Sequence, residues 1–194
     1  MKKRVIIIVV IALVAACVFW LIGKYNAMVT AEENVTTAWS QVENQYQRRS
    51  DLIPNLVATV KGYAEHERQV FENVTEARAK ATQMTLSEDA TPEQMMAFQA
   101  AQGELTQALG RLLALAENYP DLKANENFRD LQAQLEGTEN RIAVARNAFN
   151  EAAKAYNILI RKFPNNIVAG IFGFGQKAYF EADEGADKVP VVEF

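Results

Sequence analysis

The chain contains 194 residues, 49% of them hydrophobic and 23% charged, with a single cysteine and a single histidine. Four of the 20 basic residues lie at positions 2, 3, 4 and 24, whereas all 24 acidic residues follow position 31, so residues 25–194 carry 16 basic and 24 acidic side chains, a net charge of −8. Nucleic acid needs a basic surface, so this balance argues against a nucleic-acid partner.

The first predicted element is the apolar stretch from Val5 to Ile22, which has no charged or strongly polar side chain. A helix of this length is about 27 Å long at about 1.5 Å per residue, close to the ~30 Å hydrocarbon core of a bilayer. Lys2, Lys3 and Arg4 precede the stretch and only Lys24 follows closely. The positive-inside rule then predicts a membrane protein with its N-terminus in the cytoplasm and the remainder of the chain on the far, extracytoplasmic side of the membrane.

Two other interpretations of this stretch stay open. A cleaved signal peptide has an apolar core of about 7–15 residues and a small-residue cleavage site, whereas this stretch is longer and ends in Phe19-Trp20-Leu21-Ile22. A lipoprotein signal is suggested by Val14-Ala15-Ala16-Cys17, but the residues after Cys17 are apolar where a polar tether is expected. We favour the uncleaved anchor, with Trp20 and Tyr25 as interfacial aromatic residues at its outer end.

Residues 27 to about 84 are predicted to be helical, because apolar side chains recur there at steps of three or four. They are Val35, Trp39, Val42, Tyr46, Ile53, Leu56, Val60, Tyr63, Val70, Val74, Ala77, Ala81 and Met84. Pro54 interrupts the pattern, since proline lacks a backbone N–H and disfavours helix in the residue before it. Ser50 and Asp51 are good N-cap types, so we predict that one helix ends near Arg49 and another begins at Asp51. A single kinked helix is the alternative.

Two further helices are predicted beyond a loop. Thr91 is a suitable cap, with Pro92 after it and Gln94 three residues on, and it predicts a helix to about Asn118. An unbroken pattern of threes and fours predicts another helix from about Ala124 to Phe163. The fold class is therefore all-α: an N-terminal transmembrane helix, then an antiparallel, up-and-down bundle of four long helices, then an irregular C-terminal tail.

The tail changes character after Asn166. Residues 167–175 are apolar and glycine-rich, and residues 181–194 are acidic. The apolar part either folds back over the bundle core or docks on the membrane surface or on a partner. The docking candidates are Ile171, Phe172, Phe174, Tyr179 and Phe180. The predicted division is a basic cytoplasmic N-terminus (1–4), the anchor (5–23), the bundle (24–166) and the tail (167–194).

Several runs of the sequence resemble the signature of the LemA family. They are residues 38–43, Arg48-Arg49-Ser50-Asp51-Leu52-Ile53-Pro54-Asn55-Leu56-Val57, and residues 60–67, 77–78, 156–157, 163–165, 169–174 and 179–182. The second run is highly specific, and the similarity covers nearly the whole chain. The resemblance implies a bacterial envelope protein with one N-terminal span and an external bundle of four helices. It implies no reaction, because no molecular function is established for the family.

Motifs for catalysis or cofactor binding are weak in this sequence. His66 is the only histidine, so neither a metal site built on several histidines nor a Ser-His-Asp triad can form. No glycine-rich phosphate loop follows a strand, and Glu32-Glu33 is typical of a solvated helix face. We predict a protein that is not an enzyme and that binds no cofactor and no metal.

Arg48, Arg49, Asp51, Pro54 and Asn55 form the densest polar cluster of the recognisable block. We interpret them as a turn held by arginine–carboxylate and cap hydrogen bonds, and alternatively as a recognition surface at one end of the bundle.

The predicted function is that of a membrane-anchored scaffold or adaptor. It would act through protein contacts, including self-association into a homo-oligomer. The alternative is a sensor or binding module that holds a ligand between helices and works with a separate membrane partner. We do not favour a small-molecule ligand, because no residue cluster indicates one.

Overall fold

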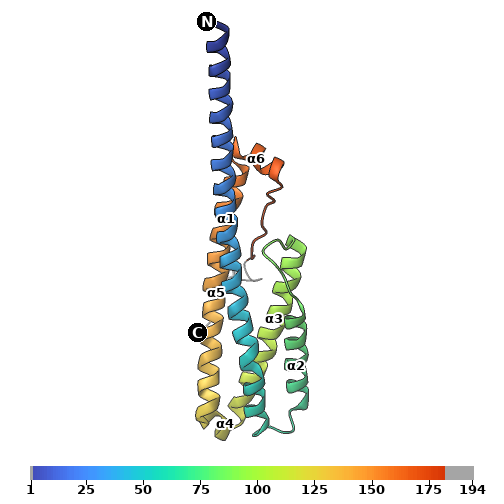
Figure 1. The fold of residues 1–194 in the computed structure, drawn as a ribbon. Coiled ribbons are helices and arrows are strands. Elements are labelled where there is room, and N and C mark those ends of the chain that lie inside the picture. Colours follow the sequence, from blue (N-terminus) through green and yellow to red (C-terminus); the bar gives the residue numbers. More distant parts are fainter. Residues whose placement is uncertain (1, 182–194) are drawn as a thin grey trace, which may run out of the picture.

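A computed structural model describes residues 2–181, which are all-α (Figure 1). Four long helices dominate: α1 (Lys2–Lys61), α2 (Arg68–Gln83), α3 (Pro92–Leu115) and α5 (Glu126–Arg161). Shorter elements are the 3-10 turn η1 (Ala116–Asn118), α4 (Pro120–Ala124) and α6 (Asn165–Phe172). Among the described residues there is no strand, and the acidic end of the tail, 182–194, lies outside the description.

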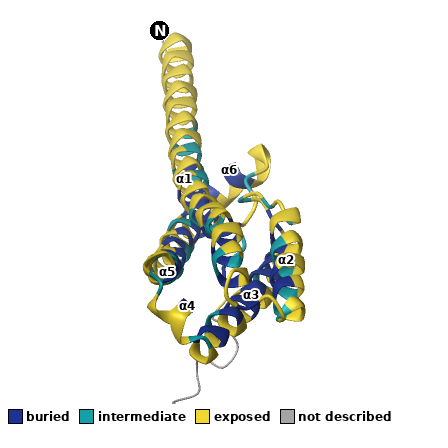
Figure 2. Ribbon diagram, turned by 90° about the horizontal axis from the view of Figure 1, so that it is seen from below, coloured by how far each residue is buried: buried dark blue, intermediate teal, exposed yellow. Residues whose placement is uncertain are grey.

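The four long helices alternate in direction, as the predicted up-and-down bundle requires (Figure 1). α1 and α5 form one closely packed antiparallel pair, and α2 and α3 form a second hairpin beside them. The first third of α1 projects beyond the bundle and is exposed along its length (Figure 2). α1 is the one described helix that is long and apolar enough to cross a membrane.

The predicted helix boundary at Arg49 and Asp51 is wrong, because α1 runs through Pro54 without a break. In a regular helix the N–H of residue 54 would bond to the carbonyl of Ser50, and proline lacks that N–H. The guanidinium of Arg78 on α2 supplies the missing donor, since its Nε donates to the Ser50 carbonyl at 3.0 Å. Ser50 and Asp51 therefore cap no helix, and the chain turns instead at residues 62–67.

This arrangement predicts that Arg78 and Pro54 are energetically coupled. We expect Arg78→Ala to cost about 1–3 kcal/mol of unfolding free energy, because it leaves the Ser50 carbonyl without a donor. In a Pro54→Ala background the backbone N–H returns and the same change costs much less. Urea unfolding of the two single variants and the double variant measures the difference. Equal costs of Arg78→Ala in both backgrounds would contradict this account.

The other helix ends follow local capping rules. Thr91 accepts a hydrogen bond from the Gln94 backbone while the Gln94 side chain accepts from the Thr91 backbone, which confirms the predicted capping box. α5 begins at Glu126 rather than Ala124, because the Asn125 side chain caps it by accepting from the amide of Phe128. The short helix α4 begins at Pro120, just after the predicted helix end near Asn118, and was not predicted.

Two hydrophobic clusters fill the bundle. The cluster nearer the projecting end of α1 is centred on Trp39, whose ring lies 5.3 Å from that of Phe149 and 5.9 Å from that of Phe180. The cluster at the far end gathers Leu56, Val60, Phe71, Leu112 and Phe128, among others. Between the two clusters lies a layer of polar side chains around Arg49, so the core is interrupted at mid-height.

Candidate functional site

Arg49 is buried inside the bundle, with 2% of its surface exposed. Its Nη1 donates to Glu139 Oε1 of α5 at 2.6 Å and to Thr106 Oγ1 of α3 at 3.0 Å. Its Nη2 donates to Gln102 Oε1, also on α3. The guanidinium lies over the ring of Tyr46, 5.2 Å from the centroid. One side chain of α1 therefore joins three helices at the mid-height polar layer.

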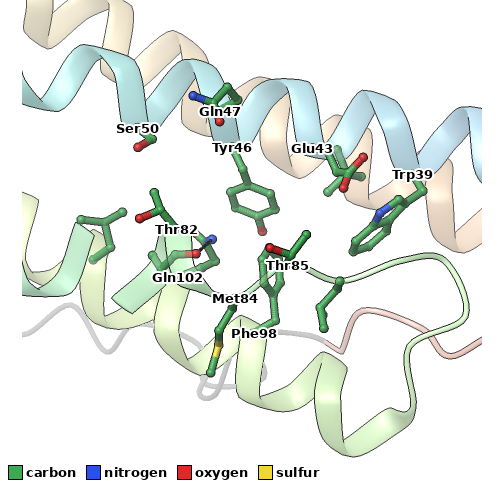
Figure 3. Close-up of a pocket in the computed structure, with 14 residues that line it drawn as sticks. Trp39, Glu43, Tyr46, Gln47, Ser50, Thr82, Met84, Thr85, Phe98 and Gln102 are labelled. Carbon is green, nitrogen blue, oxygen red and sulfur yellow. Dashed lines mark hydrogen bonds between the residues drawn. The ribbon is translucent and has the colours of Figure 1, made fainter. Parts of the chain in front are cut away.

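A pocket of about 190 Å³ opens next to this layer, between α1 and the α2–α3 hairpin (Figure 3). Tyr46 and Phe98 point into it from opposite walls, and Thr82 and Gln102 add polar groups from the hairpin side (Figure 3). Trp39 and Ser50 also line it, and the indole Nε1 of Trp39 and the hydroxyl of Ser50 are buried without a hydrogen-bond partner among the described residues. The pocket thus has an aromatic surface and lies next to two buried polar atoms that have no partner.

Lys177 is the second charged side chain in the interior, with 3% of the side chain exposed. Its Nζ lies 2.9 Å from Glu32 Oε1 of α1 and 2.5 Å from Asp89 Oδ1 in the loop between α2 and α3. It also lies over the Tyr156 ring, 5.4 Å from the centroid. Lys177 of the tail therefore bonds both to α1 of the α1–α5 pair and to the loop of the α2–α3 hairpin.

Amide side chains hold the backbone of the tail on either side of this lysine. Asn157 of α5 accepts from the amide of Lys177 and donates to its carbonyl, both at 2.9 Å. Asn150 of α5 does the same for Phe180, and Gln99 of α3 for Glu181. Each amide side chain pairs with a tail residue as a neighbouring strand would, so the tail is fixed in an extended path along the bundle.

The charges around Lys177 shift two ionisation equilibria. Burial, followed by the negative charge of Glu32, raises the pKa of Tyr156 from 10 to about 12. Burial opposes the charge on Lys177, but its hydrogen bonds to Asp89 and Glu32 outweigh this effect, and the pKa of Lys177 is raised. At neutral pH the lysine is therefore charged and the phenol is neutral.

Both shifts predict alkaline destabilisation. Between pH 10 and 12 the folded chain retains the Tyr156 proton that the unfolded chain loses, so stability falls as pH rises through that window. The raised pKa of Lys177 has the same sign, with its contribution fully present below the ordinary lysine pKa of about 10.4. Tyr156→Phe should flatten the loss of Tm measured between pH 10 and 12. The exposed-site control Tyr63→Phe should leave the slope unchanged, and equal slopes in all three proteins would contradict the prediction.

The five residues of the predicted polar corner do not form a turn. They lie on the continuous helix α1, where Arg49 points inward and Arg48, Asp51, Pro54 and Asn55 are exposed. Asp51 accepts from Gln47 on the same helix at 2.8 Å. The interpretation as a turn is therefore wrong. Arg78 supplies the hydrogen-bond donor that Pro54 lacks, so the helix continues, and Arg49 pairs with Glu139 of another helix.

The five tail candidates separate into two groups. Phe180 is buried against Trp39 and Phe149, and the Tyr179 hydroxyl accepts from Asn157 at 2.9 Å. Phe174 is half-buried, with its ring 5.6 Å from that of Tyr25. Ile171 and Phe172 of α6 are exposed. Phe180 thus packs into the bundle, Tyr179 is 42% exposed but hydrogen-bonded to α5, and α6 keeps apolar side chains on the surface.

Lys177 and Asn150 were not singled out from the sequence, and Asn157 was noted only as part of the family resemblance at residues 156–157. Periodicity identifies apolar positions, and a buried polar residue on a helix looks like a solvated one until its neighbours are known. One signal was available, because Lys177 is the only charged residue in the apolar segment 167–180. An isolated charge inside an apolar run has to find a partner when that run is packed.

Among residues 2–181 no group of three or more histidine, cysteine, aspartate or glutamate side chains is arranged to hold a metal ion. His66 is exposed in the turn between α1 and α2, and Cys17 is exposed on the apolar part of α1. The described interior instead contains polar side chains that join helices, and a pocket lies next to the polar layer around Arg49.

The structure combines a long apolar helix, which continues into an up-and-down bundle, with a tail that lies along that bundle. These features define a membrane-associated helical-bundle protein. The chain belongs to the LemA family, whose family model matches residues 38–194. It is 30% identical over 197 residues to magnetosome protein MamQ 2 of Paramagnetospirillum magneticum, covering 92% of this chain and 72% of that relative.

Two further relatives extend the comparison. Magnetosome protein MamQ of Magnetospirillum gryphiswaldense is 30% identical over 190 residues, covering 89% of this chain and 70% of its own length. Protein LemA of Metamycoplasma hominis is 22% identical over 166 residues, covering 86% of this chain and 73% of its own length. These similarities agree with the resemblance found in the sequence runs and support a membrane-associated protein.

Proposed function

We propose that the protein is a membrane-anchored scaffold that acts through protein contacts on the extracytoplasmic side of a bacterial inner membrane. The observation that carries the proposal is the continuity of α1. This helix extends 39 residues beyond Ile22 without a break, about 60 Å at 1.5 Å per residue. A continuous helix packed in a bundle presents its far half at a fixed height above the bilayer.

The exposed face of α1 around Arg48, Asp51, Pro54 and Asn55 is the proposed contact surface. Proline inside a helix costs about 3 kcal/mol relative to alanine, and the exposed position of Pro54 gains no core packing in return. Arg48 and Asn55 lie on the same face, one turn above and below Asp51, where they are free of the core. Arg78 offsets part of this cost by donating to the Ser50 carbonyl. An exposed face of mixed polar side chains that makes no contact with the core is suited to the polar rim of a protein interface.

The relatives named magnetosome proteins support a membrane-associated role for this chain. The first test is the molar mass of the full-length chain in mild detergent, measured by static light scattering with the detergent contribution subtracted. The self-assembling form of the proposal predicts a defined multimer. It also predicts that the triple change Arg48→Ala, Asp51→Ala, Asn55→Ala lowers the mass, whereas Lys154→Ala on the exposed face of α5 does not.

A monomeric mass would contradict self-assembly. Site-specific photo-crosslinking at Arg48 and Asn55 in the native membrane then tests for a different protein partner, with Lys154 as the control position. A discrete adduct at the α1 face, absent at the control position, supports the scaffold. Equal labelling at all three positions contradicts the α1 face as the contact surface.

A second candidate function is ligand binding in the pocket beside Arg49. The specific observation is that Trp39 and Ser50 line the pocket, and that Trp39 Nε1 and Ser50 Oγ are buried without a hydrogen-bond partner among the described residues, where a small shift of the wall would expose them to a ligand. A ligand with a hydrogen-bond acceptor and an apolar body of fragment size fits these groups. A thermal-shift screen of such fragments tests it, with Trp39→Phe as the control that keeps an aromatic ring but removes the indole N–H. Fragments that raise the Tm of both proteins equally would contradict binding at Trp39.

A further inference from the structure

α6 carries its large apolar side chains on the outside. Ile167 and Phe172 are each 54% exposed and Ile171 is 69% exposed, whereas the side facing the bundle is made by Asn165, Val168 and Ala169. No residue of α6 is charged. A helix that faces water usually has the opposite arrangement, with apolar residues inside and polar residues outside. We therefore expect an apolar environment, rather than water, to surround the outer face of α6.

The position of α6 beside α1 indicates what covers the outer face of α6. Phe172 lines an apolar groove of about 210 Å³ together with Val18, Leu21, Ile22 and Tyr25 of α1. Its ring also makes an edge contact with that of Tyr25, with centroids 5.0 Å apart. Figure 1 shows α6 beside α1 where the helix leaves the bundle, and Figure 2 shows that the projecting part of α1 beyond this point is exposed throughout.

Val18, Leu21 and Ile22 belong to the last turns of the apolar stretch Val5–Ile22. If that stretch crosses the membrane, a side chain in contact with Val18 and Ile22 lies at the same depth, within the outer leaflet. The groove that they share with Phe172 is then open to acyl chains rather than to water. Exposed Arg161 and Lys162 precede α6, and basic residues in that place suit the anionic phosphates of lipid headgroups.

We propose that α6 is an interfacial helix that inserts Ile167, Ile171 and Phe172 into the outer leaflet of the membrane that α1 crosses. The bilayer lipids are the occupants of its outer face and of the groove against α1. A helix whose apolar face is buried at the boundary between headgroups and acyl chains is the arrangement of monotopic membrane helices. The bundle then has two membrane attachments, which fix its rotation about the axis of α1 and so determine which face it turns toward its neighbours.

The chain offers a matched experiment. Cys17 is the only cysteine, so Cys17→Ser gives a background in which one spin label can be placed at will. Ile171→Cys tests the proposal, and Val144→Cys on α5 is the control, because both positions are occupied by apolar residues that are 69% exposed. Val14→Cys in the apolar stretch of α1 is the reference for a label in lipid.

The full-length variants are reconstituted in nanodiscs of phosphatidylethanolamine and phosphatidylglycerol, and collisions of the label with oxygen and with a water-soluble nickel chelate are measured by power saturation. We expect the oxygen-to-nickel ratio of I171C to be several-fold higher than that of V144C and to approach that of V14C. Ile167→Cys should behave like I171C, and circular dichroism checks that each variant keeps the helical content of the parent.

Three results would overturn the proposal. A ratio for I171C and I167C equal to that of V144C would place α6 in water. Protection of both labels from oxygen and nickel alike would mean that protein, such as a second copy of the chain, covers the helix. A water-exposed V14C label would remove the premise that α1 crosses the bilayer, and the proposal would fall with it.

Discussion

Replacing Arg49 by alanine should lower the free energy of unfolding by about 3 kcal/mol, the lower end of the range for breaking a buried ion pair, because the side chain of Glu139 is 36% exposed and regains some hydration. The change removes three hydrogen bonds and the contact with the Tyr46 ring, and it leaves Glu139 without its cation. It also opens space between α1, α3 and α5, where the two hydrophobic clusters are separated. Thermal and urea unfolding of the full-length protein in mild detergent, followed by circular dichroism, measure the loss.

The neighbouring residue provides a matched control. Arg48 has the same side chain on the same turn but is exposed, so Arg48→Ala should change stability by no more than about 0.5 kcal/mol. Arg49→Lys tests geometry, because an ammonium cannot reproduce the planar fork that serves Glu139, Thr106 and Gln102 together. If Arg49→Ala were as mild as Arg48→Ala, the polar layer would contribute nothing to stability.

The layer has a second consequence for the bundle. A buried polar network penalises any alignment of the helices that leaves its members unpaired, so it can specify how α1 is positioned against α3 and α5. Replacing the layer as a whole tests this role. The double change Arg49→Met, Glu139→Leu should restore much of the stability lost in Arg49→Ala while weakening the specificity of packing, which broadened amide NMR signals would report.

Lys177→Met should detach the tail from the bundle and cost about 1.5–3 kcal/mol, the range for hydrogen bonds to charged groups. Methionine keeps the length of the side chain but leaves Glu32 and Asp89 without their cation. Glu32 is about as exposed as Glu139, but Asp89 is 71% exposed and regains most of its hydration, so the loss is expected to be no larger than at Arg49. Because the raised pKa of Lys177 keeps it charged below the ordinary lysine pKa, the cost should be constant across neutral pH.

The readout specific to the tail is limited proteolysis. A released tail should be cleaved after residue 173 much faster than in the parent protein, while the bundle remains resistant. Lys162→Met is the control, because Lys162 precedes the same segment but is exposed. Equal cleavage of the parent, the control and K177M would show that the amide side chains of Asn150, Asn157 and Gln99 hold the tail without the lysine.

The sequence by itself determined the architecture. The apolar stretch ending at Ile22, the repeated steps of three and four, and the Thr91–Gln94 capping box are local signals that depend on neighbours within one or two turns of helix. They predicted an all-α chain, a long apolar N-terminal helix and an up-and-down bundle, and the structure agrees. The family resemblance rests on the same local runs and is shown by the comparisons.

Only the tertiary structure decided what the polar residues do. Pro54 looked like a break, and α1 continues through it because Arg78, 24 residues later in the chain, reaches back to the Ser50 carbonyl. Arg49 was interpreted as part of a polar turn or a recognition surface at one end of the bundle, and it is buried inside the bundle because Glu139 of α5 supplies a counter-charge. The role of Lys177 was not predicted, because its partners Glu32, Asp89 and Asn157 are distant in sequence and meet it only in the folded chain. The periodic burial of apolar side chains is encoded locally, whereas the environment of a buried charge depends on residues far away in sequence, which folding alone brings together.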